Sequence, residues 1–447
     1  MSGRVRGKAG SRGAALIVAL FAVMILTALA VTFASVVRTD VLLAGNRAAM
    51  LQSFYAAQSG VNYCRTVLAA HDPSQDSLAA EVDWVQVEDG QTGAIEWQYP
   101  ATSPAVELDI PGFTVSAVIE DESARLNINT INAATESMLL ALPGMTQDAA
   151  DSILDWRDAD EQARPMGAES DYYLSLPSPY EAANRPFDTI DELRLVRGVD
   201  TALWEGDGTD ANPGLRNLVT VRSGERNVYY DSSGRPQRRL NIVTAPRDAL
   251  QAAAHNKGIT LTRTELDAIT RQQTRLRQVG QFMNISGVSW NKRVALLDCF
   301  YVPDIPGISY TQNFTNVEGT VNLNTASEPV LEAIGLPASA AQALINQRTA
   351  QPLTTKGELA TKVPGVTQSD MIRVADRIAT KSSIFGVRVL GQAQDRPIRA
   401  GVFALLDRSG QPPTVLLWRE EPAPATTLAT GAAAQSTTPL GQVNNGS

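Results

Sequence analysis

Residues 12–38 read RGAALIVALFAVMILTALAVTFASVVR, and this stretch decides the fold of the first part of the chain. No charged residue lies between its two terminal arginines, and the run from Ala14 to Val37 would reach roughly 36 Å as a helix. That length is enough to cross the hydrocarbon core of a bilayer. The run is longer than the apolar core of a secretory signal and lacks a small-residue cleavage motif. We therefore expect the helix to be retained.

The helical pattern continues beyond the membrane-length run. Apolar residues recur at spacings of three, four or seven, which places them on one face of a helix: Leu43, Met50, Phe54, Ala57, Val61, Cys64 and Leu68. We predict one helix of about 55 residues. Its first half would lie in lipid, and its second half would pack against a globular domain.

Basic residues precede the apolar run and set its orientation. The first 13 residues contain Arg4, Arg6, Lys8 and Arg12 and no acid. Because positive residues stay on the cytoplasmic side, everything after Arg38 should lie outside the inner membrane. The sequence predicts a single-pass inner-membrane protein whose globular part is periplasmic.

The short basic leader, Gly13 and the apolar helix together resemble a type IV prepilin or a type II secretion prepseudopilin. The resemblance implies that a prepilin peptidase cuts after Gly13 and that the new amino terminus, Ala14, is methylated. Members of these families normally carry Glu five residues into the mature chain, where this sequence has Val18. A carboxylate in hydrocarbon is costly without a partner. In lacking this acid, the chain resembles the K-type minor pseudopilin. That subunit sits at the tip and needs no subunit ahead of it.

Composition excludes several classes of function. The 447 residues carry a net charge of −9, and removal of the leader leaves −13, which argues against a nucleic-acid partner. Only two histidines occur, and no nucleophile motif, phosphate loop or HExxH motif is present, so we expect no enzyme. Cys64 and Cys299 show no metal spacing, and whether they form a disulfide is left open.

Three segments of the chain share the same opening and indicate a repeat. They are LNINTINAATESMLLAL from Leu126, LNIVTAPRDALQAAAHN from Leu240 and VNLNTASEPVLEAIGLP from Val321. In each, a short strand-like run is followed by a helix and a glycine turn, and a second glycine turn comes later. We predict helical units near 126–200, 240–298 and 321–380.

The first unit is longer than the others by about 25 residues, because 54 positions separate its paired glycines and 29 or 30 separate those of the other units. The extra segment contains GAESDYY, PSPY and PFDTIDELRLVRGV, and this order resembles the most recognisable part of the K-type family. Its aromatic residues have two open interpretations, as partner contacts or as anchors that pin the loop to its own domain: Tyr172, Tyr173, Tyr180 and Phe187.

Strand-like stretches flank the helical block, at 93–99 and 112–120 before it and at 385–393, 398–407 and 414–420 after it. The predicted fold is α+β: a pilin-like domain, in which the long helix packs on a small antiparallel sheet, with a large inserted helical domain. The expected segments are a leader (1–13), a transmembrane half-helix (14–37), the first pilin-like part (38–120), the insertion (121–380), the last strands (381–421) and a disordered tail (422–447).

A cluster of acids in the extra segment is a candidate cation site: Asp155, Asp158, Asp160, Glu161, Glu169 and Asp171. Calcium takes six to eight oxygen ligands, which an irregular loop can supply, although these acids do not follow the EF-hand spacing. K-type pseudopilins are associated with calcium, and the resemblance therefore implies Ca²⁺ here. The alternative is a solvated acidic surface.

The resemblance implies a non-enzymatic subunit that caps the type II secretion pseudopilus and aids protein export across the outer membrane. I- and J-type minor pseudopilins would be its partners, packing against Leu43, Met50 and Phe54 and starting assembly with it. An exported substrate or the outer-membrane channel is a further possible partner. Two alternatives stay open: a minor pilin of a type IV or DNA-uptake system, and an uncleaved membrane-anchored scaffold.

Overall fold

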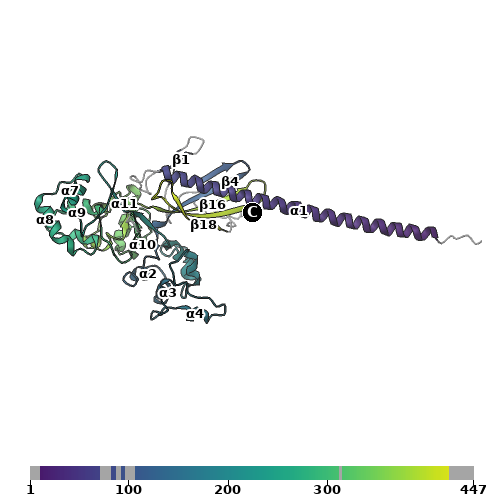
Figure 1. Cartoon of the computed structure of the whole chain (residues 1–447), viewed down its shortest axis with the longest axis horizontal. Helices are drawn as coiled ribbons and strands as arrows, with labels where there is room; N and C mark the ends of the chain where they lie inside the picture. The colour runs from purple at the N-terminus through teal and green to yellow at the C-terminus, as the bar shows by residue number, and fades with distance from the viewer. Residues whose placement is uncertain (1–10, 71–81, 87–91, 96–105, 312–314, 422–447) are drawn as a thin grey trace, which may run out of the picture.

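One long helix dominates the computed structural model of the protein, which describes residues 11–70, 82–86, 92–95, 106–311 and 315–421. This helix, α1, spans Ser11–Ala70 and is 60 residues long. Its first half projects away from the rest of the protein, and its second half runs beside the sheet (Figure 1). Every side chain described from 15 to 44 is exposed, and α1 is long and apolar enough to cross a membrane. The structure therefore confirms the predicted long helix.

An antiparallel sheet of five strands packs on the second half of α1. The strand order is β18-β17-β16-β4-β3. Their bounds are β3 Val106–Ile110, β4 Phe113–Asp121, β16 Ile384–Ala393, β17 Arg399–Asp407 and β18 Thr414–Glu421. Strands β4 and β16 are adjacent although the whole insertion separates them in sequence, and Val387 lies opposite Ile119. The predicted α+β pilin-like fold is confirmed.

Helix and sheet meet through small and branched side chains. Ala57, Val61, Cys64 and Leu68 of α1 are buried against the central strands. Gly60 allows this close approach, because a Cβ there would lie 2.7 Å from Cγ1 of Val389. Burying a side chain of the size of Val61 or Leu68 stabilises the fold by about 1.5–3 kcal/mol.

Part of the predicted strand at 93–99 does not join this sheet. Strand β2 (Thr92–Ile95) pairs only with β1 (Val82–Gln86) in a separate hairpin, and residues 96–99 lie outside the described residues. The tail predicted at 422–447 also lies outside them. Both cysteines are buried and free, so no disulfide joins Cys64 and Cys299.

The insertion between β4 and β16 lies beyond the end of the sheet (Figure 1) and contains three units, each closed by a parallel pair of short strands. The first comprises β5 Leu126–Asn127, α2 Ser137–Leu140, α3 Gln147–Arg157, α4 Ser170–Leu174, η2 Ile190–Leu195, α5 Thr201–Glu205, α6 Leu215–Leu218 and β6 Val219–Thr220. The second comprises β10 Leu240–Asn241, α7 Arg247–Asn256, α8 Arg263–Gln272, η3 Gln273–Arg275, η4 Val279–Asn284, α9 Trp290–Leu296, η5 Leu297–Cys299 and β11 Phe300–Tyr301. The third comprises β14 Val321–Asn322, α10 Glu328–Ala333, α11 Ala338–Ala350, α12 Glu358–Lys362, α13 Gln368–Val374 and β15 Ile378–Ala379.

A parallel pair of short strands closes each unit: Leu126 lies opposite Val219, Leu240 opposite Phe300 and Val321 opposite Ile378. The first unit therefore extends to Thr220, and its predicted end near 200 is wrong, because α5, α6 and β6 complete it. In all three units the asparagine that follows the first strand residue accepts a hydrogen bond of 3.0 Å from the N–H two residues later: Asn127, Asn241 and Asn322.

Short connecting elements link the units to one another and to the sheet. A three-stranded sheet has the order β12-β13-β7, and β8 pairs with β9. The bounds are η1 Glu122–Ala124, β7 Gly224–Arg226, β8 Val228–Tyr230, β9 Pro236–Arg238, β12 Ser309–Tyr310 and β13 Asn316–Glu318.

Hydrogen bonds in both directions join the second and third units: an aspartate of each unit accepts from backbone N–H groups of the other. Asp376 accepts hydrogen bonds from the N–H groups of Val279 (2.8 Å) and Gly280 (3.2 Å). Asp298 accepts one of 3.1 Å from the N–H of Lys356, which precedes Gly357 as Val279 precedes Gly280. The reciprocal bonds make the two units a pseudo-symmetric pair.

Both glycines of this pair sit against backbone of the opposite unit. A Cβ at Gly280 would lie 2.2 Å from the carbonyl oxygen of Ile372, and a Cβ at Gly357 would lie 2.3 Å from that of Val294. No larger side chain fits at either position without movement of the other unit.

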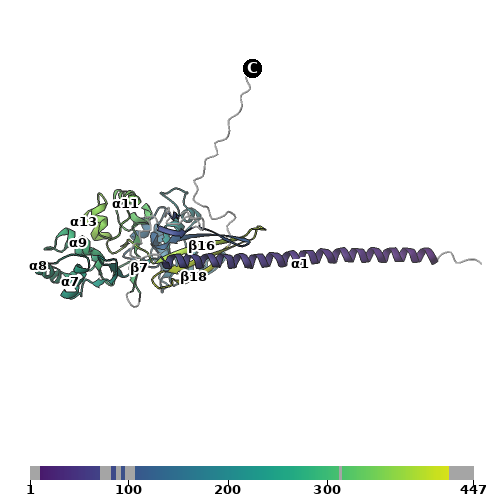
Figure 2. The same cartoon turned by 90° about the horizontal axis from the view of Figure 1, so that it is seen from above.

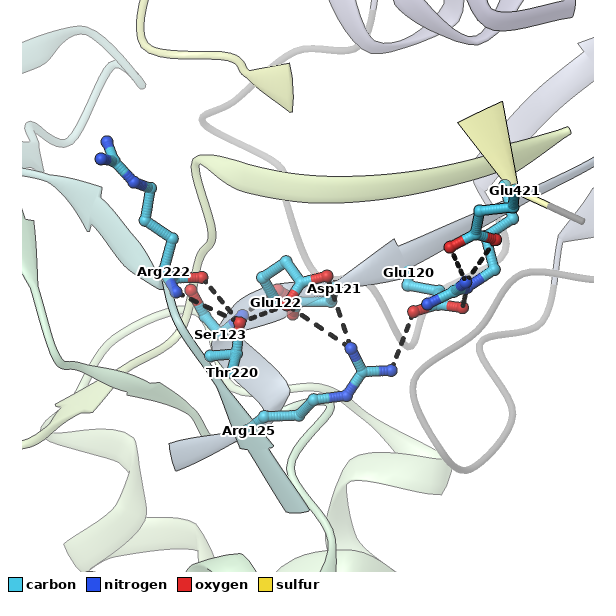
Figure 3. Close-up of polar contacts among 9 residues, drawn as sticks. Glu120, Asp121, Glu122, Ser123, Arg125, Thr220, Arg222 and Glu421 are labelled. Atoms are coloured by element: carbon cyan, nitrogen blue, oxygen red, sulfur yellow. Dashed lines mark hydrogen bonds and ion pairs between the residues drawn. The ribbon is translucent and has the colours of Figure 1, made fainter. Parts of the chain in front are cut away.

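Buried polar side chains fasten the insertion to the sheet at the end of β4 (Figure 3). Arg125 contacts Glu120 at 2.9 Å and Glu122 at 3.4 Å. Asp121 accepts hydrogen bonds from Asn322, Thr325 and Ser382 of the third unit and its flank. Because removing one partner of a buried charged pair is strongly destabilising, loss of Arg125 or Glu120 should destabilise this junction.

Candidate functional site

The predicted processing position lies at the start of α1. Gly13 and Ala14 are helical residues, and residues 1–10 of the predicted leader lie outside the described residues. Val18 is 67% exposed and supplies no charge to the first turns of the helix. The first half of α1 thus presents an apolar surface without a carboxylate.

The three residues of the predicted partner face differ in exposure. Leu43 and Met50 are exposed, whereas Phe54 is half-buried and its ring lies 6.4 Å from that of Trp418 in the chain's own sheet. Phe54 therefore contacts the chain's own sheet as well as lying on the predicted partner face, because helical periodicity does not show how far along a helix the sheet reaches. The exposed apolar surface beyond the membrane-length run also includes residues that sequence reasoning missed: Val41, Leu42, Leu51 and Tyr55.

The structure brings three of the six predicted acids together. Asp155 lies in the last turn of α3, Asp158 caps the end of that helix and Glu169 precedes α4. One oxygen from each carboxylate lies within 4.8 Å of the others. Oxygen ligands at such distances suit a hard divalent cation.

The other three acids lie outside this cluster. Asp160 accepts a hydrogen bond of 2.9 Å from the N–H of Gln162. Glu161 accepts one of 2.7 Å from the amide of Asn184, and Asp171 is exposed. The proposed ligand set from this loop is therefore reduced to three carboxylates, and the remaining acids order the loop or face solvent.

Two of the clustered carboxylates are buried and the third, Asp158, is half-buried, and the three lack enough hydrogen-bond donors. Glu169 is 5% exposed, and neither of its oxygens accepts a hydrogen bond. Asp155 is fully buried; one oxygen accepts from the N–H of Arg164 at 3.0 Å, and the other lies 3.4 Å from Nε of Arg164 without forming a hydrogen bond. Among the described residues, Arg164 and Arg157 are the guanidinium groups that attract these acids, and Arg164 also pairs with Glu136 at 3.5 Å. Buried charges in this state are costly unless another cation joins them.

The electrostatics of the cluster follow from this shortage of positive charge. Burial, together with repulsion from Asp155 and Asp158, raises the pKa of Glu169 to about 7. Burial also raises the pKa of Asp155 to about 6, and repulsion from Asp158 adds to the effect. A divalent cation would reverse both shifts by stabilising the ionised carboxylates.

Two residues that sequence reasoning missed shape the loop around the cluster. A Cβ at Gly167 would lie 1.9 Å from a carboxylate oxygen of Asp155, so only glycine fits there. Asp151, one turn before Asp155 on α3, accepts a hydrogen bond of 3.0 Å from the N–H of Met166. The spacing of four residues between Asp151 and Asp155 could have indicated this role.

Aromatic side chains mostly pin the loop to its own unit. Tyr173 is fully buried, with its ring 5.0 Å from that of Trp156 and 5.3 Å from that of Tyr180. Phe187 is buried as well, whereas Tyr172 is 39% exposed beside Arg197. Tyr173 and Phe187 therefore anchor the loop to its own unit, which is one of the two interpretations of these aromatic residues.

Comparison with known families gives matches on both sides of the middle unit. Residues 120–206 match the first-domain model of type II secretion system protein K, and residues 321–378 match a second model of the same protein. The first match contains the acidic cluster, and the second covers the third helical unit. The resemblance to the K-type family is confirmed.

Curated relatives agree with these matches. The chain is 33% identical over 122 residues to type II secretion system protein K of Pectobacterium carotovorum, a match that covers 23% of this chain and 37% of the relative. It is 35% identical over 115 residues to the protein of the same name from Pseudomonas aeruginosa, covering 23% and 34%. The matched stretches thus span about a third of the length of these relatives.

A solved structure shows a weaker likeness. The chain resembles one chain from the crystal structure of the GspK-GspI-GspJ complex of the enterotoxigenic Escherichia coli type 2 secretion system, with a TM-score of 0.45 and 15% identity. The match covers 84% of this chain and all of the other.

Proposed function

We propose that this relative of the type II secretion K proteins is a minor pseudopilin that caps the tip of the pseudopilus and aids protein export across the outer membrane. The observation that carries the proposal is the combination of a membrane-length apolar half-helix on a pilin-like sheet with an insertion that matches the K-type models. The role is structural rather than enzymatic. Its globular part works in the periplasm while α1 anchors it in the inner membrane.

The tip position follows from two features of the chain. Val18 offers no carboxylate to the amine of a subunit placed above it, so no such subunit is needed. The bulky insertion projects beside and beyond the sheet, where a closely packed shaft would leave no room for it (Figure 2). A single copy at the apex meets both constraints.

I- and J-type minor pseudopilins are the proposed partners. Their own N-terminal helices would pack on α1 where its apolar side chains are exposed beyond the membrane-length run: Val41, Leu42, Leu43, Met50, Leu51 and Tyr55. Contiguous exposed apolar surface of this kind marks a protein or membrane contact. Association there would start assembly of the pseudopilus.

Calcium is the proposed occupant of the acidic cluster. Asp155, Asp158 and Glu169 would hold it, and carbonyl groups or water would complete its oxygen shell. The bound ion would neutralise the buried carboxylates and fix the loop between α3 and α4.

Co-expression with a prepilin peptidase tests the proposal. We expect cleavage after Gly13 and methylation of Ala14, detected by mass spectrometry, and we expect the chain to restore secretion in a strain that lacks its K protein. An intact amino terminus would favour an uncleaved scaffold. Cleavage without restored secretion, combined with DNA binding in a low-salt gel shift, would favour a DNA-uptake pilin.

A further inference from the structure

A groove separates the first helical unit from the third, away from the acidic cluster. Its volume is about 580 Å³, within the range of protein ligand sites. Ala141 and Pro143 of the first unit form one wall, and Pro329 and Ile345 of the third unit form part of the other. These four residues lie in the two segments that match the K-type models, so the groove does not depend on the middle unit.

The groove is acidic. Glu328 and Glu332 lie four residues apart on α10, are half-buried and make no hydrogen bond or ion pair with other described residues through their carboxylates. Asp210 adds a third carboxylate at the rim. The cation among the described lining residues is Arg348, whose Nη1 donates to the carbonyl oxygens of Leu323 (2.8 Å) and Ala326 (2.6 Å). Three acids therefore face one base, and that base is held by backbone.

The position of Glu332 is unfavourable for the helix itself. Like charges four residues apart repel each other. Glu332 also stands one residue before the end of α10, where the helix dipole disfavours a negative charge. An external cationic group in the groove would relieve both effects.

An unpartnered hydroxyl in the wall also points to a ligand. Ser327 precedes α10 and is 4% exposed, yet its hydroxyl makes no hydrogen bond. A serine at this position normally accepts from the first turn of the helix. The Ser327 hydroxyl oxygen could therefore accept a hydrogen bond from a ligand in the groove, once a small movement of the wall exposes it.

We propose that this groove binds a basic segment of a partner polypeptide. Lysine or arginine side chains of the segment would pair with Glu328, Glu332 and Asp210. An apolar residue between them would pack on Pro143 and Ile345. The chemistry of the site requires alternating basic and apolar side chains, and the negative net charge of the chain would favour the approach of such a segment.

Peptide binding to the full chain in detergent micelles tests the proposal. The probe is a fluorescent seven-residue peptide with two lysines flanking a leucine, and its counterpart carries two glutamates. We expect the lysine peptide alone to raise the anisotropy. The double variant Glu328→Gln, Glu332→Gln should bind it at least tenfold more weakly, whereas Asp171→Asn and Glu181→Gln, which change exposed acids outside the groove, should bind it as the unaltered protein does.

A labelling experiment locates the bound peptide. Gln342 is exposed and lines the groove, and both native cysteines are buried, so Gln342→Cys introduces one accessible thiol among the described residues. The lysine peptide should slow its reaction with a maleimide several-fold. Equal peptide binding by the double variant, or labelling at an unchanged rate, would overturn the proposal, as would protection by Ca²⁺ but not by the peptide. None of these results depends on whether the chain restores secretion.

Discussion

The first helical unit shares its arrangement of strands and helices with the pair formed by the second and third units. The two regions differ in whether their buried acids accept hydrogen bonds. In the pair, Asp376 and Asp298 are buried and accept hydrogen bonds from backbone N–H groups of the opposite unit. In the first unit, Glu169 is buried equally well and accepts none. The repeat therefore supplies the scaffold, while the extra loop of the first unit adds carboxylates that the protein alone does not satisfy.

This difference separates acids that the fold itself satisfies from the acids that we propose as calcium ligands. A carboxylate that accepts backbone hydrogen bonds needs no further partner, and its loss leaves N–H groups unsatisfied. A buried carboxylate without donors is stable only when protonated or bound to a cation. The second and third units should therefore be indifferent to calcium, and the first unit should depend on it.

The largest expected effect is stabilisation of the first unit by calcium. At a Ca²⁺ concentration 1,000 times the dissociation constant, we expect about 4 kcal/mol of added stability, measured as a rise in melting temperature over a chelator control. The variants Asp155→Asn and Glu169→Gln should lose this rise. Asp171→Asn changes an exposed acid outside the cluster and should keep it. An equal rise in all four proteins would show that the ion binds elsewhere.

The dependence of stability on pH should come next in size. Folding raises the pKa of Glu169 from 4.5 to about 7, a shift that corresponds to roughly 3 kcal/mol. Because the folded state binds the proton more tightly, this stabilisation is fully present below about pH 4.5 and is lost as the pH rises through about 7. Without calcium, the stability difference between the unaltered protein and Glu169→Gln should change in this window. With saturating calcium the change should disappear, and an identical change with and without the ion would contradict the assignment.

Alanine at the paired glycines should disturb the second and third units. Gly280→Ala and Gly357→Ala would each press a methyl group against a carbonyl oxygen of the opposite unit and should cost about 3 kcal/mol. Gly410→Ala is the matched control, because the nearest atoms beyond its chain neighbours lie 3.7 Å from its added Cβ. Chemical denaturation measures the three costs. A neutral Gly280→Ala would show that the two units are not packed together as described.

The smallest effect should come from the contact of the first unit with the edge of the sheet. Asp191 pairs with Arg419 of β18 at 2.8 Å, and both side chains are substantially exposed. Exposed pairs of this kind contribute less than about 1 kcal/mol. Asp191→Ala should therefore lower the free energy of unfolding by less than that amount. A loss above about 2 kcal/mol would mean that the first unit depends on the sheet far more than its geometry indicates.

Sequence reasoning reached the parts of the fold that local patterns specify. The apolar run before Arg38 predicts α1, and the shared openings at Leu126, Leu240 and Val321 predict the three units. It could not find the end of the first unit, because the closing strand at Val219 is two residues long and pairs with residues more than 90 positions earlier. Such pairing depends on tertiary contacts rather than on local propensity.

Sequence reasoning predicted which loop carries the candidate site, but not which of its acids form the cluster. Six acids within 17 positions are equivalent in sequence, and only the fold separates Glu169, turned inward, from Asp171, which is exposed. The roles of Gly167 and Asp151 depend on the path of the loop over α3. Likewise, the reach of the sheet along α1 decides that Phe54 contacts Trp418 while Met50 stays exposed.

The number of copies in an assembled pseudopilus tests the central claim most directly. Immunogold labelling of the insertion on isolated fibres should place one cluster of gold at one end of each fibre and none along the shaft. Val18→Glu, which restores a carboxylate in the apolar helix, should be the variant that allows incorporation below the tip. Labelling of the unaltered protein at regular intervals along the fibre would contradict the account.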